Sequence, residues 1–410
     1  MAVTALYVHV PFCAQKCRYC DFDSRSFAPC DLSVVLDAYF EQLYARLDAF
    51  GKAGALDQIR TVYVGGGTPS LAGERLVKLA RRISMWCKPV EFTCEANPES
   101  LTVELAAALA KVGVTRVSLG VQTLDNTELT AIGRIHDADR ALAAIATVKN
   151  AGLDVSCDLM CALPGQTTAS WKRTLDGVLA AAPHHVSVYP LTLEEGTPLY
   201  CMACRDESLV PDEDFQAACM DVARELLGAA GYHPYEVASY ALDGHECAHN
   251  IAYWTGRGYL GLGRSAAGML DAEDFDRLAG LFPGVSSRGD AYRVRLVQHD
   301  DAATAFEAEY LSQREAAAED LMLACRMTRG IVSDLLVRAA CVIPTGELAA
   351  ACDRALELGL ATWVPETLGV HEGPFTSADV LAGHVRARLA PTHLGWLDGN
   401  VLFELFWDLA

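Results

Sequence analysis

Short β-branched runs alternate with helical patterns from Leu6 to about Tyr240, and this alternation limits the fold more than any other feature. Strands that alternate with helices form parallel βαβ units, because the helix carries the chain back to the start of the next strand. Six or more such units predict a full or partial barrel, whose functional groups lie where strands end and loops begin. The predicted strands are Leu6–Val10, Thr61–Val64, Glu91–Glu95, Arg116–Val121, Val155–Leu159, His185–Pro190 and Tyr235–Ala238; the predicted helices between them are Ser33–Phe50, Glu74–Ser84, Val103–Val112, Ala138–Ala151, Ser170–Ala181 and Asp212–Ala230.

The pattern changes after Tyr240. Residues 241–304 are rich in glycine, aromatic residues and histidine, and we interpret them as a connecting segment with a β excursion over Ala291–Gln298. A helical set follows, with a helix stop that leads into a strand, as in small winged-helix modules. We therefore expect an α/β protein with a partial (β/α)6-type barrel over residues 1–240 and a smaller helical, winged-helix-like domain over residues 305–410. The elements predicted for that domain are Ala305–Met327, Ile331–Ala340, Thr345–Leu358, Ala361–Val364 and Ser377–Leu405.

The charge balance limits the partners. The 410 residues include 33 Lys and Arg against 53 Asp and Glu, a net charge of −20, so a nucleic acid would be repelled. The start of the chain lacks a cationic leader, and every stretch long enough to span a bilayer contains charges or prolines. We therefore expect a soluble, cytoplasmic protein. In a reducing compartment, tightly spaced cysteines more often bind metal or do redox work than form structural disulfides.

Three of the 15 cysteines have such a spacing. Cys13, Cys17 and Cys20 form C-x3-C-x2-C just past the first predicted strand. Thiolates on one short loop suit an iron–sulfur cube, and three ligands in place of four leave one iron with an open coordination position. The alternatives are three core thiols or a zinc site, which would normally have a fourth Cys or His nearby; no further cysteine follows before Cys30. The loop therefore predicts a [4Fe-4S] cluster.

This loop resembles the radical S-adenosylmethionine (SAM) superfamily, in which the amine and carboxylate of SAM chelate the open iron. The run from Tyr7 to Cys13, YVHVPFC, resembles more particularly the branch that contains the oxygen-independent coproporphyrinogen III oxidases and their relatives. This resemblance runs almost from end to end of the chain.

The second strand is followed by GGGTP, residues 65–69, where glycines allow backbone groups to approach a ligand closely. A tight turn is the alternative. Later strands end in polar residues that are costly to bury without a partner. By resemblance, the glycine turn holds the amino-acid part of SAM, four polar residues hold its carboxylate and ribose, and two tyrosines flank it. The resemblance thus implies a SAM site made of Tyr7, Tyr19, Gly66, Gly67, Thr68, Glu95, Gln122, Arg134 and Asp158.

Two features separate the branches. After Cys20 the chain reads Asp21-Phe22. The sequence pattern of the oxidases has a further cysteine two residues after the third one, whereas Phe22 at that position matches the HemW-type heme chaperones. The run HNIAYW, which starts at His249, matches H-N-x-x-Y-W, the hallmark of that chaperone branch. An imidazole is a good heme-iron ligand, and Tyr and Trp offer flat faces to a porphyrin. The alternative for His249 is a hydrogen-bonded histidine in a buried aromatic corner. Ala267 also departs from the branch, which has a His there.

The resemblance therefore implies a heme chaperone that carries a [4Fe-4S] cluster and SAM, binds heme, and delivers it to an apo-hemoprotein of a respiratory chain. Any contact with a membrane would then come through such a client. The alternative function is an oxygen-independent coproporphyrinogen III oxidase, an oxidoreductase that converts propionates to vinyls in heme biosynthesis by radical oxidative decarboxylation.

Overall fold

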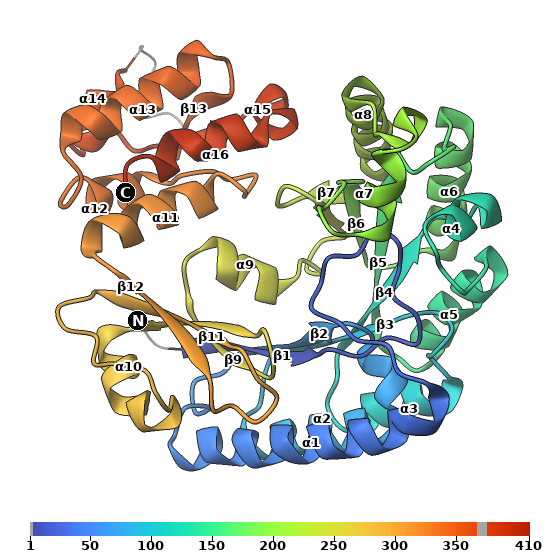
Figure 1. Ribbon diagram of the computed structural model, residues 1–410. Helices are drawn as coiled ribbons and strands as arrows, with labels where there is room; N and C mark the ends of the chain where they lie inside the picture. Colours follow the sequence, from blue (N-terminus) through green and yellow to red (C-terminus); the bar gives the residue numbers. More distant parts are fainter. Residues whose placement is uncertain (1–2, 367–374) are drawn as a thin grey trace.

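A computed structural model describes residues 3–366 and 375–410. Its largest sheet curls into an open partial barrel with strand order β12-β11-β10-β9-β1-β2-β3-β4-β5-β6-β8-β7 (Figure 1). Strands β9 and β1 to β6 run parallel, which confirms the predicted α/β class. The strands of this sheet are β1 (Val3–Val10), β2 (Thr61–Gly66), β3 (Glu91–Ala96), β4 (Arg116–Gln122), β5 (Asp154–Cys161), β6 (His185–Pro190), β7 (His233–Pro234), β8 (Ser239–Ala241), β9 (Gly258–Leu262), β10 (Ala267–Asp271), β11 (Arg293–Gln298) and β12 (Phe306–Leu311).

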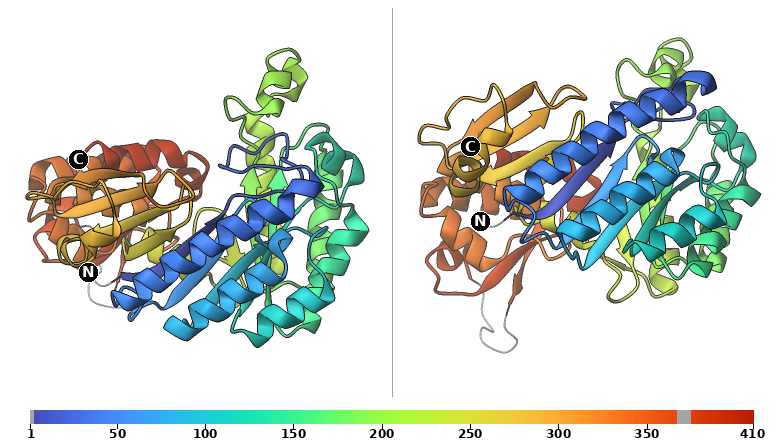
Figure 2. Two further views of the ribbon diagram at one scale, coloured as in Figure 1. Left: turned by 60° about the horizontal axis from the view of Figure 1, so that its bottom comes forward. Right: turned by 90° about the horizontal axis from the view of Figure 1, so that it is seen from below.

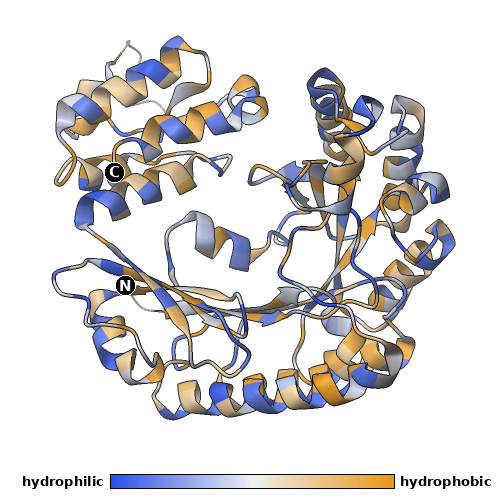
Figure 3. Cartoon of the chain, viewed as in Figure 1, coloured by the Kyte–Doolittle hydropathy of each residue, from blue (hydrophilic) through white to orange (hydrophobic). Residues whose placement is uncertain are grey.

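Helices cover the outer face of the sheet, where α1 and α2 lie along the strands (Figure 2). Along α1, hydrophobic and hydrophilic residues alternate as in a helix with one buried side (Figure 3). The helices of this part are α1 (Pro29–Lys52), α2 (Glu74–Trp86), α3 (Val103–Lys111), α4 (Asn126–Ala131), α5 (Ala138–Asn150), α6 (Thr168–Ala181), α7 (Pro198–Ala203), α8 (Glu213–Ala229), α9 (Ala248–Trp254) and α10 (Ala272–Leu278), with short 3-10 turns at Pro69–Ala72, Glu207–Leu209 and Ala279–Leu281.

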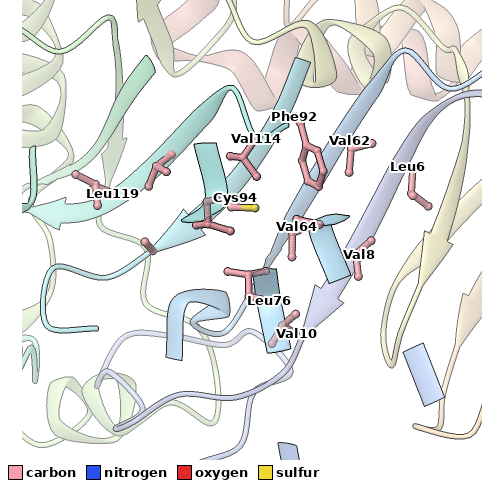
Figure 4. Packing of buried hydrophobic residues seen from close by; sticks show 14 of the residues in the cluster. Leu6, Val8, Val10, Val62, Val64, Leu76, Phe92, Cys94, Val114 and Leu119 are labelled. Carbon is pink, nitrogen blue, oxygen red and sulfur yellow. The ribbon is translucent and has the colours of Figure 1, made fainter. Parts of the chain in front are cut away.

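The two faces of each strand differ in polarity. Leu6, Val8 and Val10 of β1 lie on the outer face of the sheet, in the hydrophobic core beneath the covering helices, beside Val62 and Val64 of β2 (Figure 4). Because side chains alternate along a strand, the residues between them point inward. These inward positions are largely polar or aromatic, at Tyr7, His9, Tyr63, Thr93, Glu95, Ser118, Ser156, Asp158, Ser187 and Tyr189. A barrel interior of this kind is suited to a polar ligand.

Three predicted elements are wrong. Tyr235–Ala238 is not a strand of the sheet, because its backbone pairs with the C-terminal part of the chain, where the Val237 N–H donates to the Arg326 carbonyl. The predicted helix Ala305–Met327 begins with strand β12, in which Phe306 and Ala308 alternate with glutamates and pair with β11. The sheet thus continues past residue 240 through β9 to β12, while the predicted domain limits themselves stay a prediction.

The C-terminal helices form a second hydrophobic core, separate from that of the sheet. Their elements are α11 (Gln313–Ala324), α12 (Ser333–Ala339), α13 (Thr345–Glu357), β13 (Ala361–Pro365), α14 (Ser377–Leu381), β14 (Ala387–Pro391), α15 (His393–Leu397) and α16 (Gly399–Trp407). The third wrong prediction is the continuous helix Ser377–Leu405, because β14 interrupts it and pairs with β13 as a two-stranded antiparallel sheet. Across both described ranges, the structure contains no helix with the length and apolar character of a membrane span.

Candidate functional site

The carboxyl ends of the parallel strands surround a cavity of about 440 Å³. Most of the residues predicted for a cluster and SAM line it: Cys13, Cys17, Tyr19, Cys20, Gly66, Gly67, Glu95, Gln122, Arg134 and Asp158. These residues come from the loop after β1, from the ends of β2 to β5 and, for Arg134, from the segment between α4 and α5, which are far apart in the sequence. The topology of a parallel barrel brings them together, because its strand ends meet at one rim.

The cysteine loop is fixed by backbone hydrogen bonds on both of its sides. The Cys13 N–H donates to the Arg25 carbonyl over 3.0 Å, and the Arg18 N–H donates to the Ile132 carbonyl over 2.9 Å. Gly67 lies against this loop so closely that a Cβ there would come within 2.7 Å of a backbone oxygen of Phe12. The glycine turn therefore packs against the backbone just before Cys13, and a larger residue would displace the start of the cysteine loop.

Arg134 connects the cysteines to the strand ends. Its Nη1 donates to the Cys17 sulfur over 3.3 Å, and its Nη2 donates to Asn97 Oδ1 over 2.9 Å and to the Gly120 carbonyl. A Cβ on Gly120 would lie 2.5 Å from that nitrogen, so a larger residue there would displace the guanidinium. The Nε of Arg134 is buried and has no hydrogen-bond partner. A buried donor without a partner is costly, and a carboxylate ligand would satisfy it.

Two carboxylates face the same cavity. Glu95 accepts hydrogen bonds from the Tyr63 hydroxyl at 2.8 Å and from the Gly66 N–H at 3.0 Å, and Asp158 accepts one from Ser118 at 2.9 Å. Burial raises the pKa of Glu95 to about 7 and that of Asp158 to about 6, against the lowering effect of these hydrogen bonds. A positively charged ligand beside them would favour the ionised form of both carboxylates and so offset the effect of burial on their pKa values.

The donor set fits the expected cofactors. Three cysteine sulfurs line one cavity, and soft sulfur ligands are those that iron–sulfur clusters take. Burial raises the pKa of the Cys13 thiol, and that of Cys20 to about 11, so iron would have to displace their protons. The unpaired Arg134 Nε and the two carboxylates match the carboxylate, the hydroxyls and the positive sulfonium of SAM. Cys13, Cys17 and Cys20 would hold the cluster, with SAM beside it.

Two of the predicted SAM residues lie behind the cavity wall. Tyr7 stacks on Tyr63 at 6.3 Å between ring centroids, and its hydroxyl is hydrogen-bonded to His9 Nδ1 at 2.9 Å. Thr68 donates to the Cys13 sulfur over 3.6 Å and accepts from Asn97 Nδ2 over 2.9 Å. Both residues support the site from its second layer.

The cavity is also lined by residues that the sequence did not predict for the site, among them Tyr63, Asn97, Ser118 and Tyr189. A signal for two of them was present. Tyr63 and Ser118 lie two residues before Gly65 and Gly120, and residues two apart on a strand share a face. Asn97 directly follows β3.

His249 lies on α9, on the concave side of the sheet, and is 1% exposed (Figure 1). Its Nδ1 is hydrogen-bonded to Thr61 Oγ1 and its Nε2 to the Tyr253 hydroxyl, each at 3.0 Å. Both ring nitrogens are therefore occupied by side chains, as the alternative of a hydrogen-bonded histidine in a buried aromatic corner predicts. Ligation of heme iron by His249 would require α9 to open, and it stays a prediction.

Comparison with known proteins gives consistent results. The family model described as the radical SAM superfamily matches residues 7–178. A protein named heme chaperone HemW from Lactococcus lactis is 33% identical over 331 residues, which cover 80% of this chain and 82% of the relative. A relative of the same name from Synechocystis is 34% identical over 337 residues, covering 80% and 79%. Among solved structures, coproporphyrinogen III oxidase from Escherichia coli aligns with 99% of this chain and 90% of its own, at a TM-score of 0.72 and 18% identity.

Proposed function

Because the chain belongs to the family of radical SAM proteins named heme chaperone HemW, we propose that it binds heme and delivers it to apo-proteins. The observation that carries this proposal is the extent of the match, which runs over four fifths of the chain and of its relatives. The cluster and SAM belong to the radical SAM fold. When bound, the cluster would supply one electron to the sulfonium of SAM.

The size of the cavity limits where a tetrapyrrole could bind. Its volume of about 440 Å³ lies in the lower part of the range of about 300–1,000 Å³ that ligand sites occupy. In a cavity of that size, the cluster and SAM together would leave little room for a tetrapyrrole. A tetrapyrrole bound at the same time would lie outside it, on the rim of the barrel.

The rim offers an aromatic surface for such a ligand. Phe22 and Tyr189 line the cavity and are 59% and 43% exposed. Large apolar side chains that stay exposed beside a cavity mark a binding surface, and their flat rings suit a porphyrin. Lys16, whose ammonium donates to the Phe22 carbonyl over 2.9 Å, supplies a nearby cation for a propionate. Heme docked on Phe22 and Tyr189 would remain accessible to a client protein. That client is an apo-hemoprotein of a respiratory chain.

The test starts with protein reconstituted anaerobically with cluster and SAM. Hemin is titrated by absorbance, and turnover of coproporphyrinogen III is measured in parallel. We expect a saturable shift of the hemin Soret band, no turnover above background, and transfer of the bound heme to a respiratory apo-hemoprotein. Phe22→Ala should weaken hemin binding, whereas Met85→Ala, which truncates a 77%-exposed side chain on the outer helix α2, should leave it unchanged.

The second candidate function is the oxidase, which the shared barrel fold favours. Turnover of coproporphyrinogen III by the reconstituted protein would establish it and overturn the chaperone proposal. Hemin that stays spectroscopically free would also overturn the proposal, whatever the turnover result.

A further inference from the structure

Helix α9, which carries the HNIAYW run, is anchored at its start by a buried carboxylate. Glu91 accepts hydrogen bonds from the N–H groups of Ala248 at 2.8 Å and His249 at 2.9 Å. The same carboxylate pairs with Arg116 at 3.0 Å, and both partners are buried. A paired anion at the start of a helix satisfies donors that would otherwise lack partners. The position of His249 is therefore set by the barrel itself.

The imidazole of His249 is held on its edges and stacked on one neighbour. Its two nitrogens bind Thr61 and Tyr253, and its ring stacks on Tyr63 with 5.3 Å between centroids and 28° between planes. Burial lowers the pKa of His249 to about 3, so the ring stays neutral at any working pH. A neutral, fixed, flat ring is a good support for an aromatic partner.

Tyr63 is the partner that reaches the cavity. Its hydroxyl donates to Glu95 Oε1 at 2.8 Å, while Glu95 Oε2 accepts from the Gly66 N–H at 3.0 Å. These two donors fix the plane of the carboxylate. A ligand group must be held within about 0.5 Å and 10–20° of its working geometry, which requires a locked second layer.

We propose that His249 is a positioning residue for SAM binding: it holds the ring of Tyr63, whose hydroxyl orients the Glu95 carboxylate toward SAM. This inference rests on the proposed role of Glu95 as a SAM-binding group. It assigns the histidine of this run to the SAM site and leaves heme binding to other residues.

The barrel contains a matched control. His185 is also buried, at 2% exposure, and its nitrogens bind a hydroxyl and a tyrosine in the same manner, Ser156 at 2.8 Å and Tyr235 at 2.9 Å. Burial lowers its pKa to about 3 as well. Among the residues that the structure describes, no hydrogen bond joins either of these partners to Glu95. His185→Gln should therefore destabilise the fold about as much as His249→Gln does, without weakening SAM binding.

The experiment compares His249→Gln, Tyr63→Phe, the double variant and His185→Gln, each loaded with the cluster. The SAM Kd is measured by equilibrium dialysis, and the change in the EPR spectrum of the reduced cluster on SAM addition is recorded. Each of the first two single variants should weaken SAM roughly five- to tenfold, the effect of one lost buried hydrogen bond. The double variant should bind SAM no more weakly than the single variant with the lower affinity, because both substitutions act through the Tyr63 hydroxyl. His185→Gln should stay within about twofold of the unchanged protein.

Wild-type SAM affinity in His249→Gln, or additive losses in the double variant, would overturn the inference. If His249→Gln does not fold, Tyr253→Phe removes only the hydroxyl on Nε2 and should weaken SAM roughly two- to fivefold; unchanged affinity there would overturn it too. Hemin spectra separate this inference from the proposed function. Loss of the hemin signal in His249→Gln with intact SAM affinity would make His249 the iron ligand, whereas absence of hemin binding by the unchanged protein refutes only the chaperone function.

Discussion

Lowering the pH from 8 to 6 is expected to weaken SAM binding about tenfold through one side chain, Glu95. Burial raises the pKa of Glu95 to about 7, so the free protein changes its charge at this group within the physiological range. SAM carries a permanent positive sulfonium and N–H and O–H donors, which favour an ionised carboxylate over a protonated one. The binding-competent form is therefore the one that predominates above pH 7.

The magnitude follows from the ionised fraction. With a pKa of about 7, roughly one molecule in eleven has Glu95 ionised at pH 6 and roughly ten in eleven at pH 8, and the apparent affinity scales with that fraction. Asp158, with a pKa of about 6, is about half ionised at pH 6 and adds up to about twofold in the same direction. Affinity should thus rise with pH and level off near pH 8.

The assay is the SAM Kd of the cluster-loaded protein at several pH values between 6 and 8, measured by equilibrium dialysis without oxygen. Glu95→Gln serves as the reference, since it cannot ionise and reports every other titration, including that of the SAM amine. We expect the ratio of the wild-type Kd to the Glu95→Gln Kd to fall about tenfold from pH 6 to pH 8. A ratio that does not change with pH would show that Glu95 does not meet SAM as an anion.

Three further changes test the site and its support. Cys17→Ser should abolish the brown absorbance and the iron content of the reconstituted protein, whereas Cys201→Ser, an exposed thiol on α7, should retain both. Glu91→Ala leaves its arginine buried without a counter-ion and should lower the free energy of unfolding by roughly 3–5 kcal/mol, measured by urea denaturation. Gly67→Ala should lower the iron content because its Cβ would meet the backbone of the cysteine loop at 2.7 Å, while Gly228→Ala, with open space around it in α8, should not.

The sequence predicted the parallel core of the fold well because each of its strands has an apolar outer face between turn residues. Strands β1 to β6 begin or end within a few residues of their predicted limits. The wrong predictions lie where pairing between strands, and not the local sequence, determines the secondary structure. Glu307 and Glu309 make β12 look helical in a charged run, yet the segment pairs with β11. Ala387–Pro391 likewise becomes a strand only because β13 lies beside it.

The parts of the site that a local sequence motif marks could be predicted. The parts that tertiary packing alone determines could not. The cysteine loop, the glycine turn and the polar strand ends are local signals, and the barrel places most of them around one cavity. Tyr63 and Ser118 carry a weaker signal, their two-residue spacing from Gly65 and Gly120, which becomes informative only when the inward face of the strand is known. The hydrogen bonds of His249 to Thr61 and Tyr253 join segments almost 190 residues apart in one case, which no spacing rule foresees.

The barrel alone does not separate the chaperone from the oxidase, since the oxidase structure superposes on nearly the whole chain at 18% identity. The interior of this chain is polar, and its carboxylates and the unpaired Arg134 Nε favour a charged cofactor under either function. The difference must therefore lie outside that interior. Phe22 is at the rim, 59% exposed, two residues after the last cysteine of the loop. An apolar ring in that position adds nothing to cluster ligation, but it provides the surface on which a planar ligand can rest and leave again.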